Sequence, residues 1–206
     1  MTMKIISKGS FRILAKWIEN LFSQDAQLIG AEVGVLRGEL SQYLLNKFPS
    51  LFLYMIDFYY PEFTNGSWEQ EKINVALCEA HTRTVEYWER KFLMISDSSI
   101  AAQHIPDASL DFVYIDAGHS AADVWKDLNN WYPKVKPGGL VSGHDYNGVG
   151  DRKGKFQVKP TVDKFAKQHN YEITTGGHLV WLFVKRENED DRLRTDTVSE
   201  STINWC

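Results

Sequence analysis

The feature that most limits the possible folds is a regular alternation of short apolar segments with segments of helical spacing. Between the apolar segments, apolar side chains recur three and four residues apart, as on one face of an amphipathic helix. Such an alternation predicts an α/β fold in which helices cover a mostly parallel sheet. The apolar segments that we predict as strands are 27–33, 51–56, 92–95, 110–115, 140–143, 171–174 and 179–184.

Seven strands of this kind predict a Rossmann-like, doubly wound sheet that is mostly parallel and has an antiparallel strand near its C-terminal end. We expect residues 27–185 to form this domain, since a chain of 206 residues suits one domain with small appendages. Residues 1–26 are expected to form a helical extension, because Leu14 and Ile18 follow helical spacing. Residues 186–206 are polar and are expected to form a tail.

The composition argues against partners that require a strongly charged or strongly apolar chain. The formal charge is −4, and the only local cluster of basic residues is at 152–155, which argues against nucleic-acid binding. Cys78 and Cys206 form no disulfide framework, and no apolar segment is long enough for a membrane span or a signal peptide. We expect a cytoplasmic protein that acts on a small molecule, away from membranes, and homodimers are compatible with this composition.

Acidic residues stand at or just after the ends of the first five predicted strands. They are Glu32, Asp57, Asp97, Asp116 and Asp145. In parallel α/β sheets, ligands bind at the carboxyl ends of the strands, so these acids are expected at one edge. Carboxylates that share an edge repel each other unless cations or hydroxyl groups lie between them. The pattern therefore predicts a ribose, an ammonium or sulfonium group, a divalent metal, or several of these together.

The turn after the first predicted strand is rich in glycine. Glu32, Gly34 and Gly38 are spaced as Glu-x-Gly-x-x-x-Gly, and glycine is used where the backbone turns sharply or approaches a ligand. This turn suggests a site for a nucleoside-type cofactor. Leu36 occupies the place of the middle glycine of the dinucleotide-binding motif, which argues against NAD or FAD.

Three motifs occur in order along the chain. They are Glu32-x-Gly34-x-x-x-Gly38, then Phe-Val-Tyr-Ile-Asp-Ala-Gly-His at 112–119, and Lys-Pro-Gly-Gly-Leu-Val-Ser-Gly-His-Asp-Tyr at 136–146. The ordered set resembles the class I S-adenosylmethionine-dependent methyltransferases, in particular a branch of small metal-dependent O-methyltransferases. The resemblance covers roughly residues 27–185 and implies S-adenosyl-L-methionine as the cofactor.

The resemblance implies roles for residues of the first two strand ends. Asp57 lies 25 residues after Glu32 and looks like the acid that binds the ribose hydroxyls. Glu32 would receive the ammonium of the cofactor or hold the glycine loop through backbone N–H groups. The backbone of Gly34, with Gly38 further along the loop, would pass close to the methionine part of the cofactor.

Two further residues have two interpretations. Asp97 and Ser98 follow the third predicted strand and could meet the adenine edge of the cofactor. Ser96 or Asp97 could instead cap the helix that follows, because both residue types are common at that position.

The reaction chemistry is expected at the ends of the fourth and fifth strands. In catechol-type relatives, acids at these two ends bind Mg²⁺, and Asp116 and Asp145 stand there in this chain. The catechol pattern has an acid–amide pair after the fifth strand, which differs here, so that His144 or Asn147 is left as the third ligand. His119 or His144 is the candidate general base.

The sequence thus predicts metal-assisted O-methylation of a small hydroxylated acceptor, of sugar or natural-product type. Residues 59–68 and 147–159 would cover that acceptor. The alternatives are a metal-independent N-methyl or aminopropyl transferase and a non-catalytic cofactor-binding protein, followed by an NAD-dependent oxidoreductase.

Overall fold

The computed structural model describes residues 8–60, 69–147, 156–177 and 179–186. These residues form one mixed sheet of seven strands in the order β3-β2-β1-β4-β5-β7-β6. Only β7 runs against the other six, because it pairs antiparallel with both β5 and β6. The strands are β1 (Leu28–Val33), β2 (Leu51–Asp57), β3 (Lys91–Ile95), β4 (Leu110–Ile115), β5 (Val135–Gly143), β6 (Thr174–Gly176) and β7 (Val180–Val184). The predicted fold class is confirmed.

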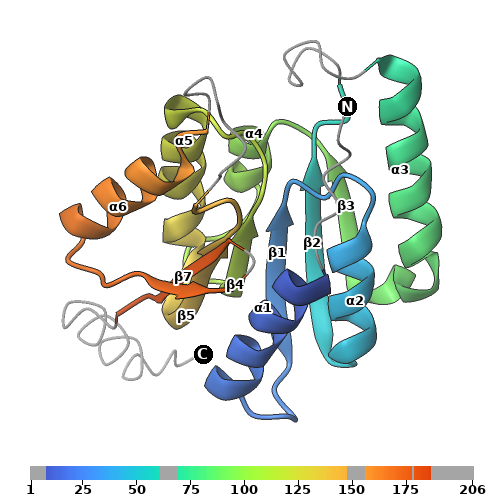
Figure 1. The fold of residues 1–206 in the computed structure, drawn as a ribbon. Helices are drawn as coiled ribbons and strands as arrows, with labels where there is room; N and C mark the ends of the chain where they lie inside the picture. Colours follow the sequence, from blue (N-terminus) through green and yellow to red (C-terminus); the bar gives the residue numbers. More distant parts are fainter. Residues whose placement is uncertain (1–7, 61–68, 148–155, 178, 187–206) are drawn as a thin grey trace, which may run out of the picture.

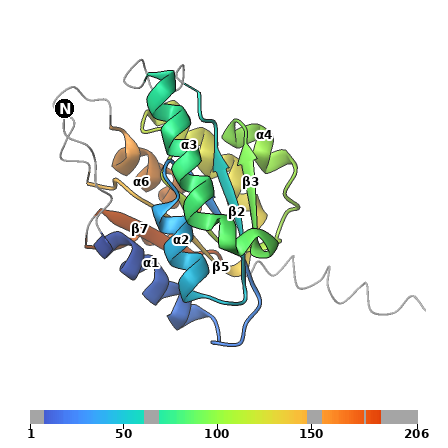
Figure 2. The ribbon, with the colours of Figure 1, turned by 90° about the vertical axis from the view of Figure 1, so that its right-hand side faces the viewer.

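Helices cover both faces of the sheet (Figure 1, Figure 2). On one face lie α1 (Lys8–Leu21), α2 (Glu39–Lys47) and α3 (Gln70–Thr84). On the other face lie α4 (Ser98–Gln103), α5 (Ala121–Trp131) and α6 (Val158–Gln168). Short 3-10 helices follow α3 and α5, namely η2 (Val85–Arg90) and η3 (Tyr132–Lys134). No helix among the described residues has the length and apolar character needed to cross a bilayer.

Each face of the sheet has its own apolar core, because side chains alternate between the faces of a strand. On β4, Phe112 and Tyr114 pack toward α1 and α2, while Val113 and Ile115 pack toward α5 and α6. All six residues of β4 are buried, as expected for a parallel strand covered on both sides. This double burial explains why the central strands read as continuous apolar segments.

Helix α1 is part of the first core. Phe11, Leu14, Ala15 and Ile18 are almost fully buried, and they pack with residues of α2 and the sheet. The apolar spacing near the N-terminus therefore builds a helix that lies against the domain.

Several boundaries differ from the sequence-based prediction by more than one residue. Strand β5 begins at Val135 rather than 140, because the Pro-Gly-Gly turn is accommodated as an irregularity in its pairing with β4. Helical spacing over 67–91 predicts a single helix, whereas α3 ends at Thr84 and continues as η2; Ser67 itself lies outside the described residues. Strand β6 covers 174–176 rather than 171–174.

Candidate active site

The parallel register brings four strand ends together at one edge of the sheet. Val33 pairs with Ile56 of β2 and with Ile115 of β4, and Ile115 pairs with Gly143 of β5. The residues that follow these pairs therefore emerge side by side, where doubly wound sheets bind their ligands. The predicted acids at these ends are Glu32, Asp57, Asp116 and Asp145.

Glu32 lies under this edge, with only 3% of its surface exposed. The hydroxyl of Ser41, in α2, donates a hydrogen bond to its carboxylate. The pKa of Glu32 is raised to about 8, mainly by burial and further by the negative charges of Asp116 and Asp57. A buried acid that is near two other acids is a place where a cationic group of a ligand would be favoured.

A side chain at either glycine of the loop would clash with a different neighbour. Gly34 has a positive φ of 97°, and a Cβ there would lie 2.2 Å from the backbone oxygen of Asp116. Gly38 has a φ of 72°, and a Cβ there would lie 2.9 Å from the Cα of Ala80 in α3. Among the described residues, Gly34 thus lies close to the residue that follows β4, and Gly38 lies close to α3. They allow the loop to lie tightly over the edge where a cofactor is predicted.

Asp57 holds the glycine loop from the neighbouring strand. Its carboxylate accepts backbone N–H bonds from Leu36 at 2.8 Å and from Tyr59 at 3.1 Å. Burial raises the pKa of Asp57, and backbone hydrogen bonds from Leu36, Tyr59, Phe58 and Val35 oppose the rise. The resemblance implies that the same carboxylate also binds the ribose hydroxyls of the cofactor.

Tyr59 belongs to the same loop structure rather than to a cover over the acceptor. Its hydroxyl donates to the backbone oxygen of Leu36 at 2.9 Å, and the side chain is buried. Tyr60 is half exposed. Most of the two predicted covering segments, at 61–68 and 148–155, lies outside the described residues.

Asp97 is the N-cap of α4, as the alternative interpretation predicted. Its carboxylate accepts from the N–H of Ser99 at 2.9 Å and pairs with Lys126 at 3.1 Å. Burial alone would raise the pKa of Asp97, but these partners outweigh it and hold the pKa below its usual value. The hydroxyl of Ser98 bonds to Asp127 and accepts from Trp131, so this side chain ties α4 to α5.

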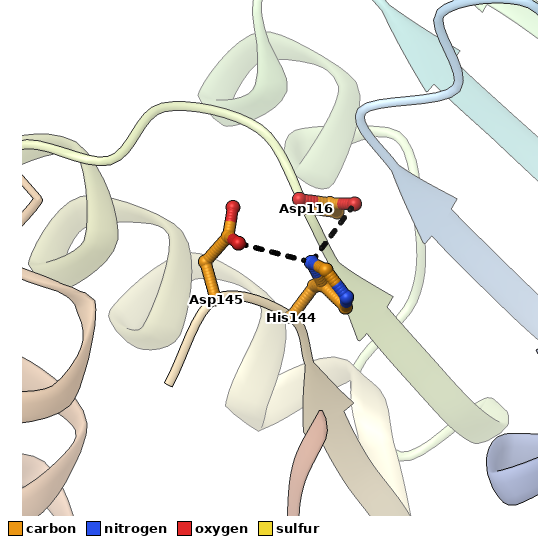
Figure 3. Close-up of side chains that lie close together, drawn as sticks. All are labelled: Asp116, His144 and Asp145. Atoms are coloured by element: carbon orange, nitrogen blue, oxygen red, sulfur yellow. Dashed lines mark ion pairs between the residues drawn. The ribbon is translucent and has the colours of Figure 1, made fainter. Parts of the chain in front are cut away.

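Asp116, His144 and Asp145 form a compact cluster at the ends of β4 and β5 (Figure 3). One donor atom from each of the three lies within 4.8 Å of the others. The Nδ1 of His144 is 3.1 Å from Asp145 Oδ1 and 4.0 Å from Asp116 Oδ2. Asp145 is almost fully buried and has a left-handed φ of 61°.

The donor set of this cluster fits a divalent cation. Octahedral ligands at about 2.1 Å from an ion lie roughly 3.0 Å apart when adjacent and roughly 4.2 Å apart when opposite. The two distances from Nδ1 of His144 are of this size. A cavity of about 10 Å³, lined by Asp116, His119 and His144 among others, adjoins the cluster. That volume is close to what one water or ion needs. Asn147, the other candidate third ligand, is exposed.

His119 lies at the open side of the same cluster. Its Nε2 is 2.8 Å from Asp145 Oδ2 and 3.8 Å from Asp116 Oδ1, and 31% of the side chain is exposed. The ring packs against Phe156, at 4.5 Å between ring centres. His119 is therefore the histidine that an acceptor molecule would meet, whereas His144 is buried.

Sequence reasoning missed three residues at this edge. Ser10, from α1, contacts Nε2 of His144 at 3.1 Å, and Ser41, from α2, bonds to Glu32. The hydroxyl of Tyr114 is buried and has no hydrogen-bond partner among the described residues, and burial, followed by the charges of Asp116 and Glu32, raises its pKa. Ser10 carried no usable signal. Tyr114 lies two residues before Asp116, on the same face of β4, and that spacing could have indicated it.

Comparison with known proteins shows the family to which the chain belongs. A family model described as a methyltransferase domain matches residues 31–146, more than half of the chain. Among curated proteins, the Uncharacterized protein y4gI of Sinorhizobium fredii is 30% identical over 106 residues. That match covers 51% of this chain and 12% of the relative, so the chain corresponds to a small part of that protein's length.

Solved structures share the fold at low identity. A candidate caffeoyl-CoA O-methyltransferase from Staphylococcus aureus has a TM-score of 0.66 at 14% identity, over 88% of this chain and 85% of its own. Precorrin-6y C5,15-methyltransferase from Geobacter metallireducens has a TM-score of 0.61 at 13% identity, over 91% and 94%. TrmK of M. capricolum, in complex with S-adenosyl-homocysteine, has a TM-score of 0.54 at 17% identity, over 89% and 70%. With the matching family model, the chain belongs to the methyltransferase-domain family, whose fold is that of the class I S-adenosylmethionine-dependent methyltransferases.

Proposed function

We propose that this chain transfers the methyl group of S-adenosylmethionine to an oxygen of a small hydroxylated acceptor, with the help of a divalent cation. The observation that carries the proposal is the cluster of Asp116, His144 and Asp145 at the same edge as Glu32 and Asp57. One group of side chains suits the cofactor and the other suits a cation. The neighbouring strand ends bring the two groups together.

Glu32, Asp57 and Tyr114 are the groups that we assign to the cofactor. Asp57 stands at the end of β2 beside the glycine loop, where the resemblance implies the acid that binds the ribose hydroxyls. Glu32 and the hydroxyl of Tyr114 stand on directly paired residues of β1 and β4, where an ammonium group would offset the buried carboxylate.

Asp116, His144 and Asp145 are the residues that would hold the cation. We propose Mg²⁺, as the resemblance implies, although an imidazole ligand also suits Mn²⁺ and other transition metals. A bound divalent cation would lower the pKa of the acceptor hydroxyl by polarising its oxygen.

His119 is the residue that we propose as the general base. The Nε2 of His119 lies 2.8 Å from Asp145 Oδ2, so a proton held on Nε2 by this carboxylate would leave Nδ1 as the basic nitrogen. Nδ1 would take the proton of the acceptor hydroxyl while the oxygen attacks the methyl carbon and the sulfonium leaves as S-adenosylhomocysteine. General-base catalysis of this kind contributes roughly 10² to 10⁴ in rate.

The remaining catalytic requirement is alignment of oxygen, methyl carbon and sulfur. Holding two reactants in line supplies several kcal/mol of the barrier reduction, on the order of 7–11 kcal/mol in the best cases. The tight loop at Gly34 and the buried cluster at β4 and β5 are rigid supports for such alignment.

The test is methyl transfer from radiolabelled S-adenosylmethionine to a panel of catechol- and sugar-type acceptors, with and without a chelator. We expect O-methylated product that is lost with the chelator and restored by Mg²⁺ or Mn²⁺. The Asp145→Asn variant should lose activity, while Asp107→Asn, at an exposed acid, should keep it. Transfer to nitrogen without metal would favour the N-methyl or aminopropyl alternative. Binding of S-adenosylhomocysteine without any turnover would favour a non-catalytic role.

A further inference from the structure

We propose that Ser10, in the N-terminal helix α1, is a positioning residue that fixes the imidazole of His144 and thereby sets the affinity of the cation site. This inference rests on the proposed function, because it concerns the same cluster. It assigns a role in the site to α1, which the sequence suggests only as a helical extension.

The contact joins two parts of the chain that are far apart in sequence. The Oγ of Ser10 lies 3.1 Å from Nε2 of His144, across a separation of 134 residues. Ser10 is fully buried, and only 6% of His144 is exposed. The opposite ring nitrogen, Nδ1, faces the carboxylates of Asp116 and Asp145. The imidazole therefore bridges a serine on α1 and the two acids at the sheet edge.

The two nitrogens of a neutral imidazole have opposite roles. A nitrogen that binds a cation needs its lone pair, so the proton must be on the other nitrogen. Histidine ligands usually donate this second N–H to a fixed acceptor, which orients the ring and raises its basicity. A serine hydroxyl can accept that bond, and it can also donate when the ring carries the other tautomer. Ser10 is thus suited to hold Nδ1 toward the carboxylates in either case.

Both ends of this arrangement are held by packing. Ser10 is followed by Phe11, Leu14 and Ala15, which anchor α1 in the first core. On the other side, Nε1–H of Trp181 donates to the backbone oxygen of His144 at 3.0 Å. The helix that carries Ser10 and the backbone of His144 are therefore both held in place. Loss of the Ser10 hydroxyl would remove the contact to Nε2 of the imidazole.

The experiment measures binding of Mn²⁺ to the full chain by electron paramagnetic resonance, without substrate. Ser10→Ala should weaken Mn²⁺ binding about 10- to 100-fold, the usual effect of removing a partner of a metal-binding histidine. The variant should still fold, because alanine favours helices more than serine does. The matched control is Ser142→Ala, at a fully buried serine whose hydroxyl bonds to a backbone oxygen, that of Val113.

A second readout follows the tautomer of His144 directly. Long-range ¹H–¹⁵N spectra of the Mg²⁺-loaded protein should show the His144 proton on Nε2, and a His144→Gln variant assigns that signal. In Ser10→Ala, weaker binding should leave part of the protein without the ion, and the signal should shift toward a mixture of tautomers. A purely structural role of Ser10 would change the melting temperature and leave this signal where it is.

The outcomes separate this inference from the proposed function. If wild type binds Mn²⁺ and Ser10→Ala binds it within about twofold, the role of Ser10 is wrong and the cation site stands. If Ser142→Ala loses as much affinity as Ser10→Ala, the effect is general loosening and the role of Ser10 is again wrong. If wild type binds no Mn²⁺, the cation site fails, and the role of Ser10 fails with it.

Discussion

Replacement of Glu32 by Gln should stabilise the protein at high pH. The pKa of Glu32 is raised from 4.5 in an exposed chain to about 8 in the fold, mainly because the carboxyl is buried. A carboxyl with a raised pKa favours folding while it is protonated, and this contribution is lost as pH rises from about 4.5 through about 8. Each pKa unit corresponds to 1.36 kcal/mol, so wild type should lose about 3 kcal/mol from this group between pH 5 and pH 8.

Glutamine keeps an acceptor for the hydroxyl of Ser41 and carries no charge. The Glu32→Gln variant should therefore lack this part of the pH dependence. Urea unfolding at pH 5, 6.5 and 8 measures it, with Glu89→Gln, at an exposed position of η2, as the control. A free-energy difference between Glu32→Gln and wild type that is the same at pH 5 and pH 8 would refute the reasoning.

The same substitution should weaken the cofactor site. An ammonium group beside Glu32 favours its ionised form, so S-adenosylhomocysteine binding at pH 7 should release close to one proton. Calorimetry in buffers of different ionisation enthalpy measures this release, which Glu32→Gln should abolish. Glu32→Gln should therefore make the fold more stable and weaken S-adenosylhomocysteine binding, as is common when an acid serves function at a cost in stability.

Three further substitutions test other parts of the site. Asp57→Asn should weaken S-adenosylhomocysteine binding by on the order of 1–3 kcal/mol in calorimetry, because it removes charge-assisted hydrogen bonds; unchanged affinity would contradict the ribose assignment. Asp116→Asn should abolish Mn²⁺ binding and spare cofactor affinity, and retained Mn²⁺ binding would place the cation elsewhere. Gly34→Ala should destabilise the fold by roughly 3 kcal/mol or more in urea unfolding, because its Cβ would lie 2.2 Å from the Asp116 oxygen at a positive φ. A normal unfolding midpoint would refute that steric account.

The sheet could be predicted from the sequence because its central strands are buried on both faces. Strand β4, at Leu110–Ile115, matches the predicted boundaries, since a fully buried strand bounded by polar residues has a clear signal. The predicted start of β5 was wrong because Pro137, Gly138 and Gly139 are residues typical of a turn. In the fold, the sheet tolerates them as an irregularity in its pairing.

The candidate site could be predicted only in part. Acids at strand ends are visible in sequence, and parallel topology brings Asp116 and Asp145 together. Asp97 was ambiguous because a carboxylate suits a helix cap as well as an adenine contact. The glycine pattern showed that Gly34 requires a close approach, but the neighbour, the backbone of Asp116, depends on sheet order.

The contact of Ser10 with His144 could not be predicted from the sequence. It stands in the first turns of a helix with ordinary amphipathic spacing, where serine carries no special signal. Its relation to His144 arises because α1 packs against the end of the sheet that contains β5. Contacts over such sequence separations follow from tertiary packing and cannot be derived from local spacing.

The most direct measurement is a crystal structure of the chain with S-adenosylhomocysteine and Mn²⁺, with anomalous scattering to locate the ion. We predict the nucleoside over the loop at Gly34, with its ribose on Asp57. The anomalous peak should lie between Asp116, His144 and Asp145. A nucleoside bound away from Asp57, or a fully occupied ion site away from these three residues, would contradict the account.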